Sequence, residues 1–152
     1  MPRISPQKIN YWMLFKLPAA FICGVRVRQL NSQLCVTSVT YGWINQNPFR
    51  SMYFAVQAMA AELSTGAQLM FHISESTRDF SMLVISNSSD FKKKATGRIT
   101  FSCTDGPLVA DAVLLAITTG EKQTLLLKST GTDAADDIVC EMAFEWSIKL
   151  RK

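Results

Sequence analysis

Apolar and polar residues alternate along several stretches of the chain, and strict alternation is the pattern of a strand with one buried face. The alternation is clearest over 98–103 (RITFSC) and 144–150 (FEWSIKL), where every second residue is apolar. Strands are predicted over 25–28, 34–41, 69–74, 80–86, 97–103, 124–129 and 138–150. The first two are expected to form a hairpin, because Asn31 and Ser32 supply a turn between them.

An alanine-rich stretch after the hairpin predicts a long helix over 48–65. Pro48 suits the first helical turn, the alanines favour helix, and Gly66 suits the helix end. Shorter helices are predicted over 6–16, over 18–23 and between Asp105 and Gly120. The predicted fold class is therefore α+β, with a long antiparallel sheet, a central helix laid against it, a short N-terminal helix and one peripheral helix.

The length and composition of the chain indicate its number of domains and its oligomeric state. A chain of 152 residues has the size of one domain, and we expect a single domain over 1–152 with an N-terminal helical segment over 1–24. Hydrophobic residues make up 48% of the chain and charged residues 18%. So few charges leave little polar surface for a monomer, and the composition therefore predicts a homodimer.

The formal net charge is +4, and its densest part is the run Lys92-Lys93-Lys94. A charge this modest, without a nucleic-acid-binding motif, favours an anionic small ligand over DNA or RNA as the partner. A strand edge kept soluble by lysines is the other interpretation of this run.

The cysteine and histidine residues do not form a metal-binding sequence motif. The four cysteines lie far apart and His72 is the single histidine, so no zinc-binding spacing exists. The cysteines are interpreted as buried thiols of a reducing compartment, and His72 as a structural residue on the strand over 69–74. Residues 11–25 (YWMLFKLPAAFICGV) are similar to the apolar part of an export signal, but Lys16 and Pro18 interrupt them. We expect a cytoplasmic protein without a membrane partner, with export as the alternative.

One carboxylate, Glu62, lies deep within the predicted long helix. Its neighbours at three and four positions are Ala58, Met59, Thr65 and Gly66. An ionised carboxylate on such a face must find donors, stay hydrated in a cleft or take a raised pKa, and each option makes it a candidate general base or nucleophile activator. A glutamate on the solvent edge of a helix is the plainer interpretation.

Around Glu62 the sequence resembles the hotdog-fold acyl-CoA thioesterases of the phenylacetate-pathway type, and above all a thioesterase-like branch of unassigned function. In those thioesterases an asparagine lies six residues before a His-Gly pair, and an Asp or Glu follows the histidine by nine. Here Asn47 precedes Tyr53 by six residues, and Glu62 follows Tyr53 by nine. Tyr53 stands in place of the histidine, and Phe54 and Ala55 stand in place of glycines.

The resemblance implies a hotdog fold, in which an antiparallel sheet wraps around a long helix, and it implies hydrolysis of an acyl-CoA thioester without a cofactor or metal. Glu62 would activate water or attack directly, the backbone N–H of Phe54 would stabilise the oxyanion, and Asn47 would position water or the thioester. Tyr53 and Glu62 differ by about half a turn of helix phase at ~100° per residue, so the site would lie between two subunits. Pairing of such dimers into tetramers stays open.

Five further assignments concern substrate binding. Tyr53 would line or close an acyl tunnel, Gln57 would face either a ligand or the partner helix, and Lys92, Lys93 and Lys94 would bind the phosphates of coenzyme A. The His-Gly element is absent, so the alternative function is a non-catalytic hotdog module. Such a module would bind an acyl chain or another apolar ligand, or would serve as an interaction domain.

Overall fold

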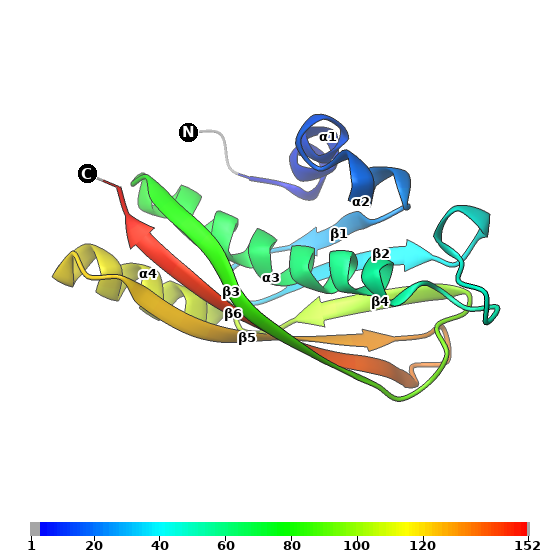
Figure 1. The fold of residues 1–152 in the computed structure, drawn as a ribbon. Coiled ribbons are helices and arrows are strands. Elements are labelled where there is room, and N and C mark those ends of the chain that lie inside the picture. Colours follow the sequence, from blue (N-terminus) through cyan, green and yellow to red (C-terminus); the bar gives the residue numbers. More distant parts are fainter. Residues whose placement is uncertain (1–3, 152) are drawn as a thin grey trace.

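The computed structural model describes residues 4–151, in which one antiparallel sheet and one long helix form the body of the molecule (Figure 1). The strands of this part of the chain are β1 Arg26–Leu30, β2 Cys35–Thr40, β3 Phe80–Phe91, β4 Arg98–Cys103, β5 Gln123–Thr132 and β6 Ile138–Leu150. Their order is β1-β2-β4-β5-β6-β3, and all neighbours pair antiparallel. β1 and β3 are therefore the two edges of the sheet.

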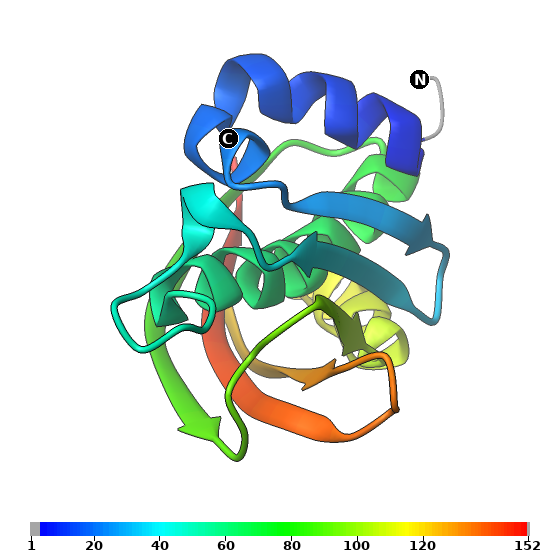
Figure 2. The ribbon, with the colours of Figure 1, turned by 90° about the vertical axis from the view of Figure 1, so that its right-hand side faces the viewer.

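The sheet curls around helix α3 (Phe54–Ser76), as Figure 2 shows. Small side chains let the helix approach the strands closely: the Thr37 hydroxyl donates to the Ala60 carbonyl (2.7 Å), and the hydroxyls of Ser64 and Ser129 are 2.8 Å apart. A long helix wrapped by an antiparallel sheet is the hotdog arrangement. The fold implied by the resemblance and the predicted α+β class are both confirmed.

Shorter helices surround this core: α1 Pro6–Lys16, α2 Pro18–Ile22, the 3-10 turn η1 Trp43–Asn45 and α4 Gly106–Thr119. α1 begins where the Ser5 hydroxyl accepts the N–H of Lys8 (3.3 Å), as its sequence indicates. The side-chain amide of Asn10 bonds both the N–H (2.8 Å) and the carbonyl (2.9 Å) of Val27, so α1 covers part of the β1 edge. Within residues 4–151, no side-chain amide bonds the backbone of β3 in this way.

The predicted boundaries of the long helix are wrong at both ends. The helix begins at Phe54 rather than Pro48, and it continues to Ser76 rather than ending near Gly66. Gly66 lies in its middle, and Thr77 ends it in the left-handed conformation with φ of 57°. Pro48 instead belongs to a loop that precedes the helix.

The strand predicted over 69–74 is also wrong, because this stretch is the C-terminal part of α3. Residues 63–69 are all buried. A helix that is covered on nearly every side loses the one-sided apolar pattern by which helices are recognised, and a short apolar run then looks like a strand. His72 is accordingly helical, and its Nε2 lies 3.1 Å from the carbonyl of Ser32, which agrees with a structural role.

The other predicted strands and helices are present with shifted ends, chiefly because β3 extends to Phe91 and β5 to Thr132. Cys35, Cys103 and Cys140 are buried free thiols, and Cys23 is half-buried. No helix among the residues described here is long and apolar enough to cross a membrane.

Candidate functional site

Residues 47–53 form a tight loop between η1 and α3, and the side chain of Asn47 holds this loop together. Its Oδ1 accepts hydrogen bonds from the N–H groups of Phe49 (2.8 Å) and Ser51 (3.2 Å). Its Nδ2 donates to the Ser51 hydroxyl (3.0 Å) and to the Met52 carbonyl (3.2 Å). An asparagine that bonds its own loop is a common way to fix a turn. The amide predicted to position substrate is thus engaged within the loop.

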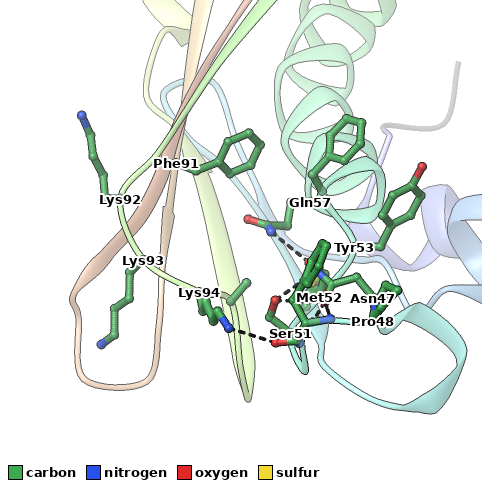
Figure 3. A pocket seen from close by; sticks show the side chains of 13 residues that line it. Asn47, Pro48, Ser51, Met52, Tyr53, Gln57, Phe91, Lys92, Lys93 and Lys94 are labelled. Carbon is green, nitrogen blue, oxygen red and sulfur yellow. Dashed lines mark hydrogen bonds between the residues drawn. The ribbon is translucent and has the colours of Figure 1, made fainter.

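This loop, the first turns of α3 and the segment 91–95 after β3 enclose a pocket of about 750 Å³ (Figure 3). Aromatic rings form much of its wall. The rings of Tyr53 and Phe54 are 5.1 Å apart, and those of Phe54 and Phe91 are 6.4 Å apart, both edge to face. A pocket of this size with mostly apolar walls suits a small organic ligand.

Helix α3 begins at the wall of this pocket with unpaired backbone donors. Tyr53 precedes the helix in an extended conformation (φ −60°, ψ 131°), and no described side chain caps the helix start with a hydrogen bond. The N–H groups of Val56 and Gln57 bond back to the Tyr53 carbonyl, whereas those of Phe54 and Ala55 have no partner within residues 4–151. Free N–H groups and the positive end of the helix dipole favour an oxygen that carries negative charge.

Like Ser51, Gln57 on the first turn of α3 is a buried polar side chain of the pocket. It is 4% exposed, its Nε2 donates to the Met52 carbonyl (3.3 Å), and its Oε1 has no partner within the described chain. This bond fixes the orientation of the Gln57 amide, because the Met52 carbonyl can only accept and the amide nitrogen must therefore face it. A buried acceptor without a partner costs about 1–3 kcal/mol, which a donor group on a ligand would offset.

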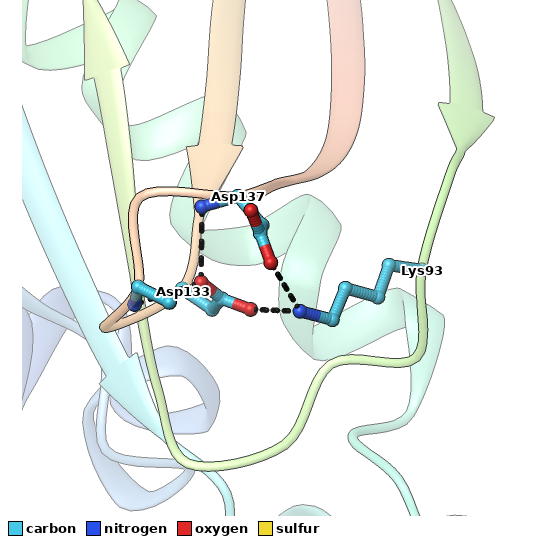
Figure 4. A network of polar contacts seen from close by, with 4 residues as sticks. Lys93, Asp133 and Asp137 are labelled. Atoms are coloured by element: carbon cyan, nitrogen blue, oxygen red, sulfur yellow. Dashed lines mark hydrogen bonds and ion pairs between the residues drawn. The ribbon is translucent and has the colours of Figure 1, made fainter.

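Lys93 lines the pocket, but its ammonium is bound by the β5–β6 turn. Its ammonium lies 2.6 Å from a carboxylate oxygen of Asp133 and 2.8 Å from one of Asp137 (Figure 4). These hydrogen bonds raise the pKa of Lys93, and Lys93 in turn lowers the pKa of Asp133. Asp137, for which the sequence suggests no role, is thus one of the two carboxylates that pair with Lys93.

Lys92 and Lys94 differ in the direction of their side chains and in whether a carboxylate pairs with them. Lys92 pairs with Asp90 and lies 3.7 Å from Glu141, and its side chain points away from the loop that contains Asn47 (Figure 3). Lys94 points toward that loop and donates to the Phe49 carbonyl (3.0 Å). Of the three lysines, Lys94 alone directs its charge toward the pocket and has no carboxylate partner among the described residues.

Glu62 does not line this pocket. It lies eight residues beyond Phe54, about 12 Å along the helix axis at ~1.5 Å per residue. The side chain is half-buried, has no hydrogen-bond or ion-pair partner within residues 4–151, and burial alone raises the pKa of its carboxyl group. Gly66, one turn further, makes this tight packing possible: a Cβ there would lie 3.3 Å from the Trp146 ring and 3.5 Å from Glu62 Oε1.

The pocket therefore gathers all of the predicted site residues except Glu62: Asn47, Tyr53, Phe54, Gln57, Lys92, Lys93 and Lys94. Sequence reasoning missed the other lining residues, which are Pro48, Phe49, Ser51, Met52, Phe91 and Ala95. The sequence carries no signal for Phe91, because single apolar residues are common on protein surfaces. Within the described chain, no cluster of three or more metal-ligating side chains occurs.

Comparison with known families gives one match over nearly the whole chain. The family described as "Domain of unknown function (DUF4442)" matches residues 7–148. None of the curated protein sequences matches the chain.

Solved structures match the fold over almost their full lengths. A protein of unknown function from Pseudomonas aeruginosa, PA5026, named a probable thioesterase, is 22% identical with a TM-score of 0.78, and the match covers 98% of this chain and 99% of that one. The protein OLEI01261 from Chlorobaculum tepidum is 13% identical with a TM-score of 0.82, over 96% and 94% of the two chains. The thioesterase HI1161 from Haemophilus influenzae is 8% identical with a TM-score of 0.72, over 97% and 92%. The fold is thus shared with hotdog thioesterases.

Proposed function

The chain belongs to the family described as a domain of unknown function, DUF4442, and from its fold and the pocket at the start of α3 we propose that it hydrolyses an acyl thioester. The substrate would be an acyl-CoA, and the reaction would need no cofactor or metal. Structural relatives named as thioesterases support the reaction class. The observation that carries the proposal is that the N–H groups of Phe54 and Ala55, beside a mostly apolar pocket, have no partner among the described residues.

The N–H of Phe54 would stabilise the oxyanion. When water adds to the thioester carbon, the carbonyl oxygen gains negative charge, and a fixed N–H at a helix N-terminus favours that charge. The donor is a backbone group, so phenylalanine can supply it as glycine does. The half-exposed Phe54 ring would then contact the acyl chain in the pocket.

Glu62 would act as the general base on the pocket of the partner subunit. A half-buried carboxylate with a raised pKa and no competing partner accepts a proton from water more readily than an exposed one. The tetrahedral intermediate would then collapse, the carbon–sulfur bond would break, and the thiolate of coenzyme A would take up the proton. The separation of about 12 Å from Phe54 within one chain is the reason for invoking a second subunit.

The free edge of β3 is the surface we propose for this homodimer. It carries Leu83, Ile85 and Phe91, which are 65%, 49% and 45% exposed. An uncovered edge with apolar side chains favours pairing with another strand, and two β3 strands would continue the sheet from one subunit to the next. The other edge is less available, because Asn10 occupies backbone groups of Val27.

A pocket that binds an acyl chain without hydrolysing it is the second candidate. It is favoured by the engagement of the Asn47 amide within its own loop and by the presence of Tyr53 in place of a histidine. Binding and hydrolysis differ in whether Phe54 N–H and Glu62 act on a bound thioester. The experiment below separates the two.

Phe54→Pro removes the proposed oxyanion donor with little structural change. Proline is favoured at the first position of a helix, and Tyr53 already has the extended conformation that suits a residue before proline. Phe54→Ala is the matched control, because it removes the ring and keeps the N–H. Thiol release from a panel of acyl-CoAs is measured for the wild type and both variants.

We expect Phe54→Pro to lower kcat by about 100- to 1,000-fold, the usual cost of losing one oxyanion donor. Phe54→Ala should mainly change KM and the preferred chain length. Absence of turnover on every acyl-CoA would leave the non-catalytic candidate. Equal kcat values for Phe54→Pro and Phe54→Ala would exclude Phe54 N–H as the oxyanion donor.

A further inference from the structure

Large apolar side chains lie exposed on α1, α2 and η1. We call them the N-terminal apolar surface: Tyr11 (71% exposed), Phe15 (64%), Ile22 (60%), Trp43 (83%) and Ile44 (54%). α1 buries Ile9 and Met13 on its inner side, so this helix is apolar on both sides. The rings of Tyr11 and Phe15, one turn apart, meet edge to face at 5.4 Å. Apolar exposure of this extent on one region marks an interaction site.

These elements follow one another along one side of the molecule, with α2 beside α1 and the turn of η1 beside α2 in both views (Figures 1 and 2). The Asn45 side-chain amide ties η1 to the end of α2 by donating to the Cys23 carbonyl (3.0 Å). Phe49, which is 69% exposed, lies in the loop after η1 and also lines the pocket. The N-terminal apolar surface therefore leads toward the pocket.

The charges of the chain are divided sharply at Glu62. All 12 acidic residues lie at Glu62 or beyond it. The basic residues before Glu62 are Arg3, Lys8, Lys16, Arg26, Arg28 and Arg50. Lys16 directly follows Phe15, Arg50 directly follows Phe49, and both cations are exposed. The part of the chain that carries the N-terminal apolar surface is thus cationic and contains no carboxylate side chain.

We propose that the N-terminal apolar surface docks the protein on an anionic lipid bilayer, a membrane partner that the sequence alone did not lead us to expect. Aromatic side chains are enriched at the headgroup level of membranes, and neighbouring lysine and arginine side chains are attracted by anionic lipids. Trp43, Tyr11 and Phe15 would enter the interface, while Lys16 and Arg50 would meet lipid phosphates. A second copy of the chain fits this surface less well, because two cationic faces repel each other.

Sedimentation with vesicles tests the proposal. Vesicles of phosphatidylcholine with and without phosphatidylglycerol are mixed with the full chain at low and high salt. Trp43→Ser and Phe15→Ser remove aromatic groups, and Lys16→Glu with Arg50→Glu reverses the charge. Leu114→Ser is the matched control, because Leu114 on α4 is as exposed as Phe15, 64% in both cases, and lies outside this surface. Thermal unfolding confirms that each variant is folded.

The wild type should sediment with anionic vesicles and lose most of this binding at high salt or with neutral vesicles. Trp43→Ser and Phe15→Ser should each weaken binding about tenfold, the charge reversal should weaken it at least as much, and Leu114→Ser should leave it unchanged. Equal sedimentation with neutral vesicles, or none with anionic ones, would overturn the proposal. So would tighter binding of a single-stranded oligonucleotide, or light scattering in which Trp43→Ser converts an oligomer into a smaller species.

Discussion

The loop that shapes the pocket should depend on one side chain, Asn47. Asn47→Ala removes the acceptor for the N–H groups of Phe49 and Ser51, and it removes the donor to the Ser51 hydroxyl and the Met52 carbonyl. A protein hydrogen bond contributes about 0.5–1.5 kcal/mol net. Residues 48–50 of the loop are exposed, so water can replace some of these bonds in the variant, and we expect a loss of about 2–3 kcal/mol in the free energy of unfolding.

Asn47→Asp is the matched control for this prediction. The aspartate keeps an oxygen that accepts from the Phe49 and Ser51 N–H groups, and it lacks the two donated bonds, so about half of the loss is expected. Urea unfolding followed by tryptophan fluorescence measures both variants, since the buried Trp146 becomes exposed to solvent when the chain unfolds. If Asn47→Ala unfolds within about 0.5 kcal/mol of the wild type, the amide does not hold the loop and is free for a substrate.

Three further predictions concern the carboxylate, the core and the proposed dimer. Glu62→Gln should stabilise the fold at neutral pH. Burial raises the carboxyl pKa of Glu62, so the wild type loses stability as the pH rises from the ordinary pKa of 4.5 through the pKa of the folded state. Urea unfolding should therefore show a gain for the variant at neutral pH and none at a pH below 4.5. Gly131→Ala should cost about 1–3 kcal/mol, since its Cβ would lie 2.7 Å from the Phe101 ring and 2.9 Å from Cys140 Sγ; thermal unfolding that matches the wild type would contradict this packing. Leu83→Lys should turn the dimer into a monomer with the same far-ultraviolet spectrum, and light scattering checks the mass.

The sheet could be predicted from the sequence wherever one face of a strand is solvated. β4 alternates strictly between buried and more exposed side chains, and β6 does so from Met142 to Trp146, because the inner side chains face α3 and the outer ones face solvent. The continuation of α3 beyond Gly66 was not predicted, because residues 63–69 in its middle are all buried and the one-sided helical pattern is lost there. The start of α3 was misplaced for a local reason: Pro48 is compatible with a first helical turn, yet the side chain of Asn47 folds the next residues into a loop.

The candidate site was partly visible in the sequence. The spacing of Asn47, Tyr53 and Glu62 led to the helix whose first turn borders the pocket, because a fixed spacing before a helix start is a local property. Whether a charged side chain reaches a pocket depends on residues that are distant in the sequence. Lys93 lies at the pocket wall, yet its ammonium is held by Asp133 and Asp137, which come forty and more residues later in the chain.

Complementation between two inactive variants tests the central claim that each site draws Phe54 N–H from one subunit and Glu62 from the other. Phe54→Pro and Glu62→Gln proteins are unfolded together, refolded as a mixture and assayed for thiol release from an acyl-CoA. If the site is shared, each mixed dimer contains one intact site, and the mixture should recover about a quarter of the wild-type activity. Activity no higher than that of the separate variants would contradict a site built between subunits.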